Sequence, residues 1–158
     1  LIEWLPRSRG TTAGRADPSA RQRVLTACWM TKSLLPTLTP PRFAAWLSTA
    51  VRHSLGAVCE VRHGAASCVA LPEALRFHAE TTRERQRMLA AGLGWPAEGE
   101  VPLARGLEDW LDRLGVPRRL SALGVAEAAI AEVARAVVEE APGIADEPAI
   151  REALRRMA

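Results

Sequence analysis

The 158-residue sequence contains no tyrosine, no asparagine and only one lysine, Lys32. Its three cysteines lack C-x-x-C spacing, which argues against a disulfide framework and a zinc ribbon. No apolar run approaches the roughly 20 residues that a membrane-spanning helix needs. We therefore expect no membrane partner, buried thiols in a reducing compartment, and a cytoplasmic location.

Positive charge is modest, although 20 of the 21 basic residues are arginine, and the formal net charge is +3. Arginines alternate with acidic residues, as over 83–85 and 108–113, and no aromatic residue interleaves with a basic stripe. This pattern is typical of solvated helix faces, and we expect no nucleic-acid partner. A hydrophobic content of 48% excludes a disordered chain.

Apolar residues recur mostly at helical spacing, and the sequence predicts an all-α fold of about seven helices with no convincing strand. The helices are expected over 18–33, 40–55, 63–77, 81–93, 103–114, 125–141 and from about 146 to the end. Asp17 should cap the first, with Pro18 at its first position. Thr39 should cap the second, which Gly56 should end in a left-handed conformation.

Other patterns predict finer features. Segment 7–17 reads as a loop and 34–41, with three prolines, as a connector. Pro72 should bend or interrupt its helix. The first helix is expected to place Val24, Leu25, Cys28 and Trp29 on one face. The fourth helix is expected to turn Met88 and Leu89 inward. No glycine-rich phosphate loop follows a strand, so a nucleotide site within this chain is not expected.

Three stretches carry a specific signature: Thr-Ala-Val-Arg-His-Ser-Leu-Gly over 49–56, Val-Arg-His-Gly-Ala-Ala over 61–66, and Val-Ala-Leu-Pro-Glu-Ala-Leu-Arg-Phe over 69–77. Together they resemble the C-terminal helical domain of the iron-containing (group III) alcohol dehydrogenases, which include the maleylacetate reductases. That family has a helix ending in His-x-Leu-Gly, a second histidine ten residues later in Pro-His-Gly, and then an apolar helix. Arg62 replaces the proline here. The segment 114–125 is similar to the family's late Gly-x-Pro and Leu-Gly-Val element.

The resemblance implies an NAD(P)-dependent oxidoreductase whose N-terminal domain holds the nicotinamide and whose helical domain holds iron or zinc. The metal ligands in that family are one Asp and three His. His63 matches the third histidine, and Thr49 stands where the second is expected. The remaining pair would precede Leu1. A neutral hydroxyl binds a divalent ion weakly, so metal binding is expected to be degraded.

His53 matches a family histidine near the substrate, which implies a catalytic role in carrying a proton. From spacing alone, His53 could instead cap its helix or pack as a neutral side chain. Cys59 and Cys68 lie close enough in sequence to His63 to leave a rewired thiolate site open. Arg62 could bind an acidic substrate group or a cofactor phosphate, or simply be solvated.

The resemblance implies that residues 1–158 form one helical domain, the C-terminal half of a two-domain protein that begins before Leu1. Its expected partners are a small alcohol, aldehyde or ketone, the missing nucleotide-binding domain, and a second copy of the chain through an uncovered apolar face. The competing hypothesis is a non-catalytic helical module for interaction or assembly, derived from that family.

Overall fold

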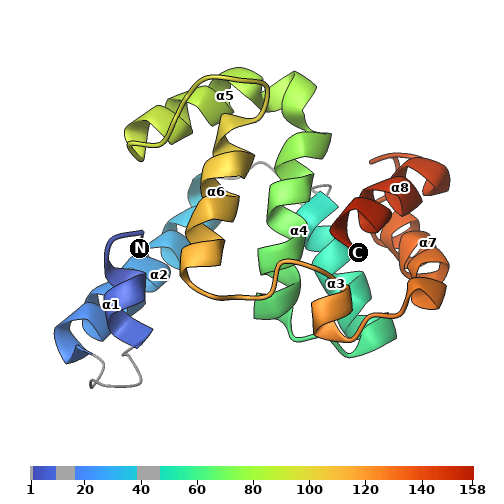
Figure 1. The fold of residues 1–158 in the computed structure, drawn as a ribbon, viewed down its shortest axis with the longest axis horizontal. Helices are drawn as coiled ribbons and strands as arrows, with labels where there is room; N and C mark the ends of the chain where they lie inside the picture. The colour runs from blue at the N-terminus through green and yellow to red at the C-terminus, as the bar shows by residue number, and fades with distance from the viewer. Residues whose placement is uncertain (1, 10–16, 39–46) are drawn as a thin grey trace. The chain divides into compact units, whose positions relative to one another are not determined.

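The chain is all-α wherever its structure is described, in a computed structural model that covers residues 2–9, 17–38 and 47–158. Within these ranges it has eight α-helices, two short 3-10 helices and no strand (Figure 1). The predicted fold class is therefore confirmed, with one α-helix more than the seven expected. Backbone contacts divide the chain into two compact units, 1–43 and 44–158.

The first unit pairs α1 (Trp4–Arg9) with α2 (Pro18–Leu38). The loop predicted from residue 7 is wrong at its start, since α1 continues to Arg9. The predicted cap is confirmed: the Ser19 amide donates to the Asp17 carboxylate at 2.9 Å. The Trp4 ring is covered by guanidinium groups, with the Arg7 and Arg23 carbons 4.4 and 4.6 Å from its centroid.

Helix α2 is longer than expected, and large apolar side chains on it are exposed. It runs to Leu38, so the connector predicted from residue 34 is wrong over 34–38. Leu25 and Trp29, which were expected on one face of this helix, are 69% and 70% exposed. Their burial would need a partner that this unit does not supply. The cap predicted at Thr39 and the start of the helix predicted over 40–55 lie outside the described residues.

The second unit contains the remaining helices. They are α3 (Leu47–Cys59), α4 (His63–Phe77), α5 (Ala79–Gly92), α6 (Pro102–Arg113), α7 (Ile130–Glu140) and α8 (Glu147–Met157), with 3-10 turns at Ser121–Leu123 and Glu127–Ala129. Helix α4 packs against α3, α5, α6 and α8, and α7 packs against α3 and α8. Helix α4 therefore links the α5 and α6 side of this unit to the side formed by α3, α7 and α8.

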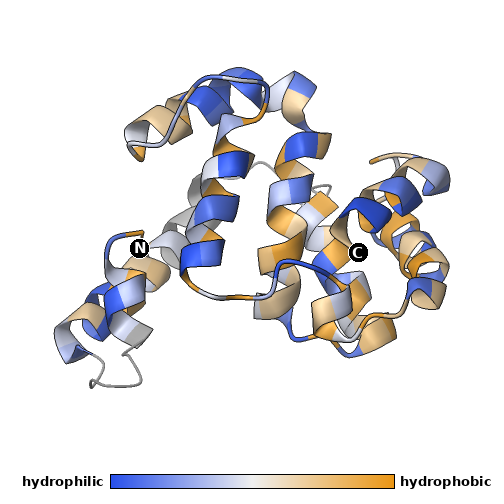
Figure 2. Ribbon diagram, viewed as in Figure 1, coloured by the Kyte–Doolittle hydropathy of each residue, from blue (hydrophilic) through white to orange (hydrophobic). Residues whose placement is uncertain are grey.

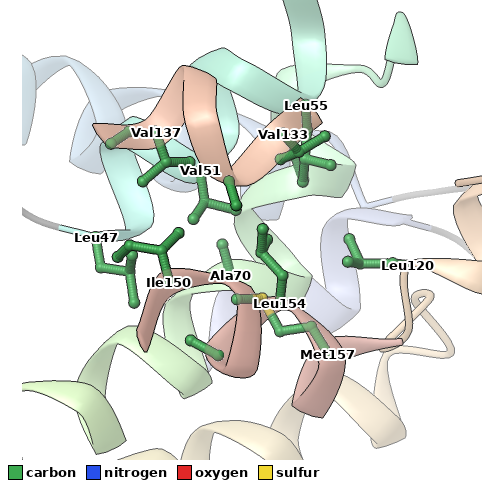
Figure 3. Packing of buried hydrophobic residues seen from close by; sticks show 14 of the residues in the cluster. Leu47, Val51, Leu55, Ala70, Leu120, Val133, Val137, Ile150, Leu154 and Met157 are labelled. Atoms are coloured by element: carbon green, nitrogen blue, oxygen red, sulfur yellow. The ribbon is translucent and has the colours of Figure 1, made fainter. Parts of the chain in front are cut away.

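One apolar core holds α3, α4, α7 and α8 together (Figure 3). Its fully buried large side chains recur at helical spacing and include Leu47, Val51, Leu55, Val133, Val137, Ile150 and Leu154. Burying each such side chain stabilises the fold by about 1.5–3 kcal/mol. Helix α5 is mostly hydrophilic (Figure 2). Of the side chains predicted inward there, Met88 and Leu89 are 68% and 56% exposed, so that prediction is wrong.

The end of α3 and the effect of Pro72 also differ from expectation. Helix α3 runs past Gly56 to Cys59, and the left-handed residue that follows it is Glu60, at φ 55°. Pro72 lies inside α4 without interrupting it. The Asp146 cap of α8 agrees with expectation, since its carboxylate accepts from the Ala149 amide at 2.9 Å. No helix of the described ranges is both long and apolar enough to cross a membrane.

Candidate functional site

Helix α3 presents the first two residues of the candidate site. Thr49 and His53 are four residues apart and therefore lie on the same face, one turn from each other. Val51 and Leu55, on the same helix, are fully buried in the core and fix the orientation of the helix. The backbone below His53 is thus held by packing, while the side chain itself stays 40% exposed.

The turn after α3 brings a second histidine to the first. Glu60 takes its left-handed conformation between the helices, and α4 begins at His63. The imidazole centroids of His53 and His63 are 5.3 Å apart, with their planes at 53°. These histidines line an open cavity of about 420 Å³ together with Gly56, Ala57 and Val61. The two histidines that the family motif singles out therefore share one surface.

A carboxylate that the sequence did not point to completes this surface. Glu140, the last residue of α7, lies with its Oε1 2.7 Å from the Nδ1 of His53. The two residues are 87 positions apart. Their side chains are 40% and 42% exposed and border a further open cavity of about 390 Å³. The two residues meet because α7 packs against α3 in the folded chain. Their spacing in the sequence could therefore not have indicated this pair.

The described residues do not by themselves fit a metal ion. Across residues 2–9, 17–38 and 47–158, no three His, Cys, Asp or Glu side chains come together as ligands. His63 offers one imidazole, and Thr49 offers a hydroxyl where the family has a histidine. Zinc sites use three or four protein ligands, so a complete site would need residues from outside these ranges.

The rewired thiolate site is not supported by the surroundings of the thiols. Burial raises the pKa of the Cys59 thiol, and the nearby Glu132 carboxylate raises it further. Burial likewise raises the pKa of the Cys68 thiol. Both groups therefore stay protonated at neutral pH, and neither is activated as a thiolate by its surroundings. All three cysteines are unpaired.

Two other side chains near the motif, His78 and Arg62, lie in different environments. His78 follows α4 and accepts a hydrogen bond from the Leu47 amide at its Nε2, 3.4 Å away. Burial lowers the pKa of His78, so the neutral form that this bond requires is favoured. His78 thus joins α3 to the end of α4 as a structural residue. Arg62, at the N-cap of α4, is exposed beside the histidines.

These observations define the class of protein. It is an all-helical domain with two neighbouring histidines, one at the start of a helix and one on the face of another helix. The family model for the C-terminal part of the Fe-containing alcohol dehydrogenases matches residues 6–152. This match covers most of the chain, and the chain belongs to that family. The resemblance drawn from the motifs is therefore confirmed, and with it membership of an oxidoreductase family.

Particular relatives agree with this assignment. The chain is 30% identical to the maleylacetate reductase of Rhizobium sp. (strain MTP-10005), over 99% of this chain and 41% of that protein. The crystal structure of that Rhizobium enzyme matches with a TM-score of 0.74 and 26% identity, over 99% of this chain and 41% of the other. The chain thus spans less than half the length of this relative.

More distant structures share the fold. NADH-dependent butanol dehydrogenase A from Thermotoga maritima matches 72% of this chain and 33% of its own, with a TM-score of 0.63 and 21% identity. A 1,3-propanediol oxidoreductase matches 71% of this chain and 32% of its own, with a TM-score of 0.59 and 24% identity. At these identities the likeness supports the helical architecture alone.

Proposed function

We propose that the chain forms the helical wall of the active-site cleft in an NAD(P)-dependent oxidoreductase that interconverts a small alcohol with its aldehyde or ketone. The observation that carries the proposal is the His53–His63 pair, with ring centroids 5.3 Å apart beside an open cavity. Membership of the Fe-containing alcohol dehydrogenase family supports the reaction class. The name of the 30% identical relative, a maleylacetate reductase, agrees with an oxidoreductase.

The nucleotide site belongs, in this proposal, to a domain outside the 158 residues. The chain corresponds to 41% of the Rhizobium reductase, which leaves length for a separate nucleotide-binding domain. Residues 1–158 would then be the C-terminal helical domain of the longer protein. Its unpaired thiols are compatible with a cytoplasmic location, which we propose for it.

His53 is the residue to which we assign the proton step. When bound, the nicotinamide accepts or supplies the hydride at the substrate carbon. During alcohol oxidation, the Nε2 of His53 takes the hydroxyl proton, and during carbonyl reduction it returns a proton to the substrate oxygen. Nε2 is the ring nitrogen that does not contact Glu140. Imidazole suits the task because one ring nitrogen can accept a proton and later return it.

The metal site is degraded in this proposal. His63 keeps one of the three histidine positions of the family, and Thr49 replaces another with a weak ligand. We expect metal analysis of the longer protein to find iron and zinc well below one equivalent. The Thr49→His variant should raise the bound metal, since it restores an imidazole one turn from His53. Stoichiometric metal in the unmodified protein would contradict a degraded site.

The experiment that tests the proposed function uses the longer protein that contains these 158 residues. NADH and NADPH oxidation are followed with a panel of small aldehydes and ketones. Loss of general acid–base catalysis predicts a fall in kcat of about 10²–10⁴-fold for His53→Ala. Arg87→Ala, on the hydrophilic helix α5, is the matched control and should retain activity. Absence of turnover and of nucleotide binding in the unmodified protein would instead favour a non-catalytic module.

A further inference from the structure

Glu140 is a carboxylate to which the family motif assigns no role. We propose that Glu140 is a positioning residue for His53, which fixes the imidazole tautomer and leaves Nε2 as the nitrogen that exchanges a proton with substrate. This inference rests on the proposed function of His53, but its structural part is measurable without turnover.

The hydrogen-bond chemistry of the pair determines the tautomer. An ionised carboxylate can only accept hydrogen bonds, so the contact of 2.7 Å requires a proton on Nδ1 of His53. In the neutral ring, the other nitrogen then carries the lone pair. Carboxylates and carbonyls fix the tautomer of functional histidines in this way. The lone pair of Nε2 is what a base needs to remove a proton from a substrate alcohol.

The two side chains stand on helices that the core holds in place. Val51 and Leu55 anchor α3, while Val133 and Val137 anchor α7, and all four are fully buried. The distance between His53 and Glu140 is therefore set by packing rather than by a mobile loop. A rigid support of this kind is what keeps a reacting group within the narrow geometry that proton transfer demands.

The position of Glu140 in its helix also favours a role beyond helix stability. It is the last residue of α7, where the partial negative charge of the helix end disfavours a carboxylate and favours a cation. Glu139 precedes it with a like charge. A hydrogen-bond donor next to Glu140 offsets its unfavourable interactions with the helix end and with Glu139. His53 provides that donor.

An ordinary surface ion pair between half-exposed residues is the competing explanation. Such a pair contributes little to stability, and its removal would leave kcat unchanged. The two explanations differ in the tautomer of His53 and in catalysis, and the experiment addresses both.

The first measurement is the ring protonation of His53 in the 158-residue chain, by long-range ¹H–¹⁵N NMR at pH 8. We expect the proton of His53 on Nδ1 in the unmodified chain and redistribution towards Nε2 in Glu140→Ala. The ring signals of His63 provide the internal reference, and Glu132→Ala, another acidic residue of α7, is the matched control. A proton on Nε2 of His53 in the unmodified chain would overturn the proposal.

The second measurement is steady-state kinetics of the longer protein. Loss of a supporting residue typically costs about 10–100-fold, so we expect Glu140→Ala to lower kcat by that factor with little change in KM. Glu140→Gln, whose amide oxygen can accept the same hydrogen bond, should recover part of the loss. In a His53→Ala background, Glu140→Ala should have no further effect.

The results separate a failure of this inference from a failure of the proposed function. If His53→Ala lowers kcat and Glu140→Ala does not, Glu140 has no positioning role while the function of His53 stands. An equal loss from Glu140→Ala with and without His53 would overturn the inference in the same way. If His53→Ala leaves kcat unchanged, the proposed function itself is wrong, whatever the NMR spectra report.

Discussion

At the scale of single residues, His78 should make stability depend on pH. Burial lowers its pKa in the folded chain, so the unfolded chain binds more protons as the pH falls below about 6.5, the ordinary histidine value. Its contribution to stability is full above that pH and is lost as the pH falls through the lowered, folded pKa. In urea titrations from pH 7.5 to 5, we expect the native chain to lose more stability than His78→Gln. Equal losses of stability in the native chain and in His78→Gln would contradict this prediction.

A second residue-scale prediction concerns Glu73, whose side chain is only 5% exposed. Its Oε1 accepts a hydrogen bond of 2.7 Å from the Nε of Arg156, which joins α4 to α8. Arg156→Met keeps the aliphatic stem but leaves the carboxylate with a weaker partner, Arg76 at 4.0 Å. We expect a loss of about 1–3 kcal/mol in the free energy of unfolding, measured by urea denaturation.

The neighbouring arginine provides the control for that variant. Arg155 lies 3.7 Å from Glu127, and both side chains are more than half exposed. Arg155→Met should therefore cost no more than about 1 kcal/mol. Equal effects of the two substitutions would mean that the burial of Glu73 adds nothing to the strength of its ion pair.

At the scale of elements, the approach of the α5–α6 connection to α6 depends on a glycine. A methyl group at Gly106 would lie 2.3 Å from Cε3 and 2.7 Å from Cδ2 of Trp95, so the indole would have to move. Overpacking costs about 1–3 kcal/mol, against a gain of up to about 1 kcal/mol in helix propensity. Gly106→Ala should thus lower the thermal midpoint, whereas Gly92→Ala, with open space around it, should not. A higher midpoint for Gly106→Ala would contradict the close contact.

The elements also differ in how far the sequence could predict them. The strongly amphipathic pattern of 103–114 and the Asp146 cap indicated α6 and α8 almost to the residue. Polar α5 offers few apolar residues to define a face, and the buried side of that helix carries Gln86 instead of Met88. Gln86 is held there by hydrogen bonds to the Leu75 carbonyl and to Thr82, which periodicity does not reveal.

At the scale of the whole molecule, the candidate site was only partly predictable. The family motif pointed to His53 and His63, ten residues apart, because a short turn between two helices keeps such residues close. Glu140 was missed because its contact with His53 depends on how α7 packs against α3, across 87 residues. The sequence predicted the end of α3 at Gly56 because a left-handed conformation usually favours glycine. The residue that adopts this conformation after the helix is instead Glu60.

The most direct measurement is a crystal structure of the proposed longer protein with a nicotinamide cofactor and an alcohol-like inhibitor bound. We predict the inhibitor oxygen within hydrogen-bond distance of Nε2 of His53, at about 2.6–3.2 Å, with His63 lining the same cleft. The Nδ1 of the same ring should remain on Glu140. A cofactor and inhibitor bound at a surface that includes neither histidine would contradict the role of this chain as a wall of the active site.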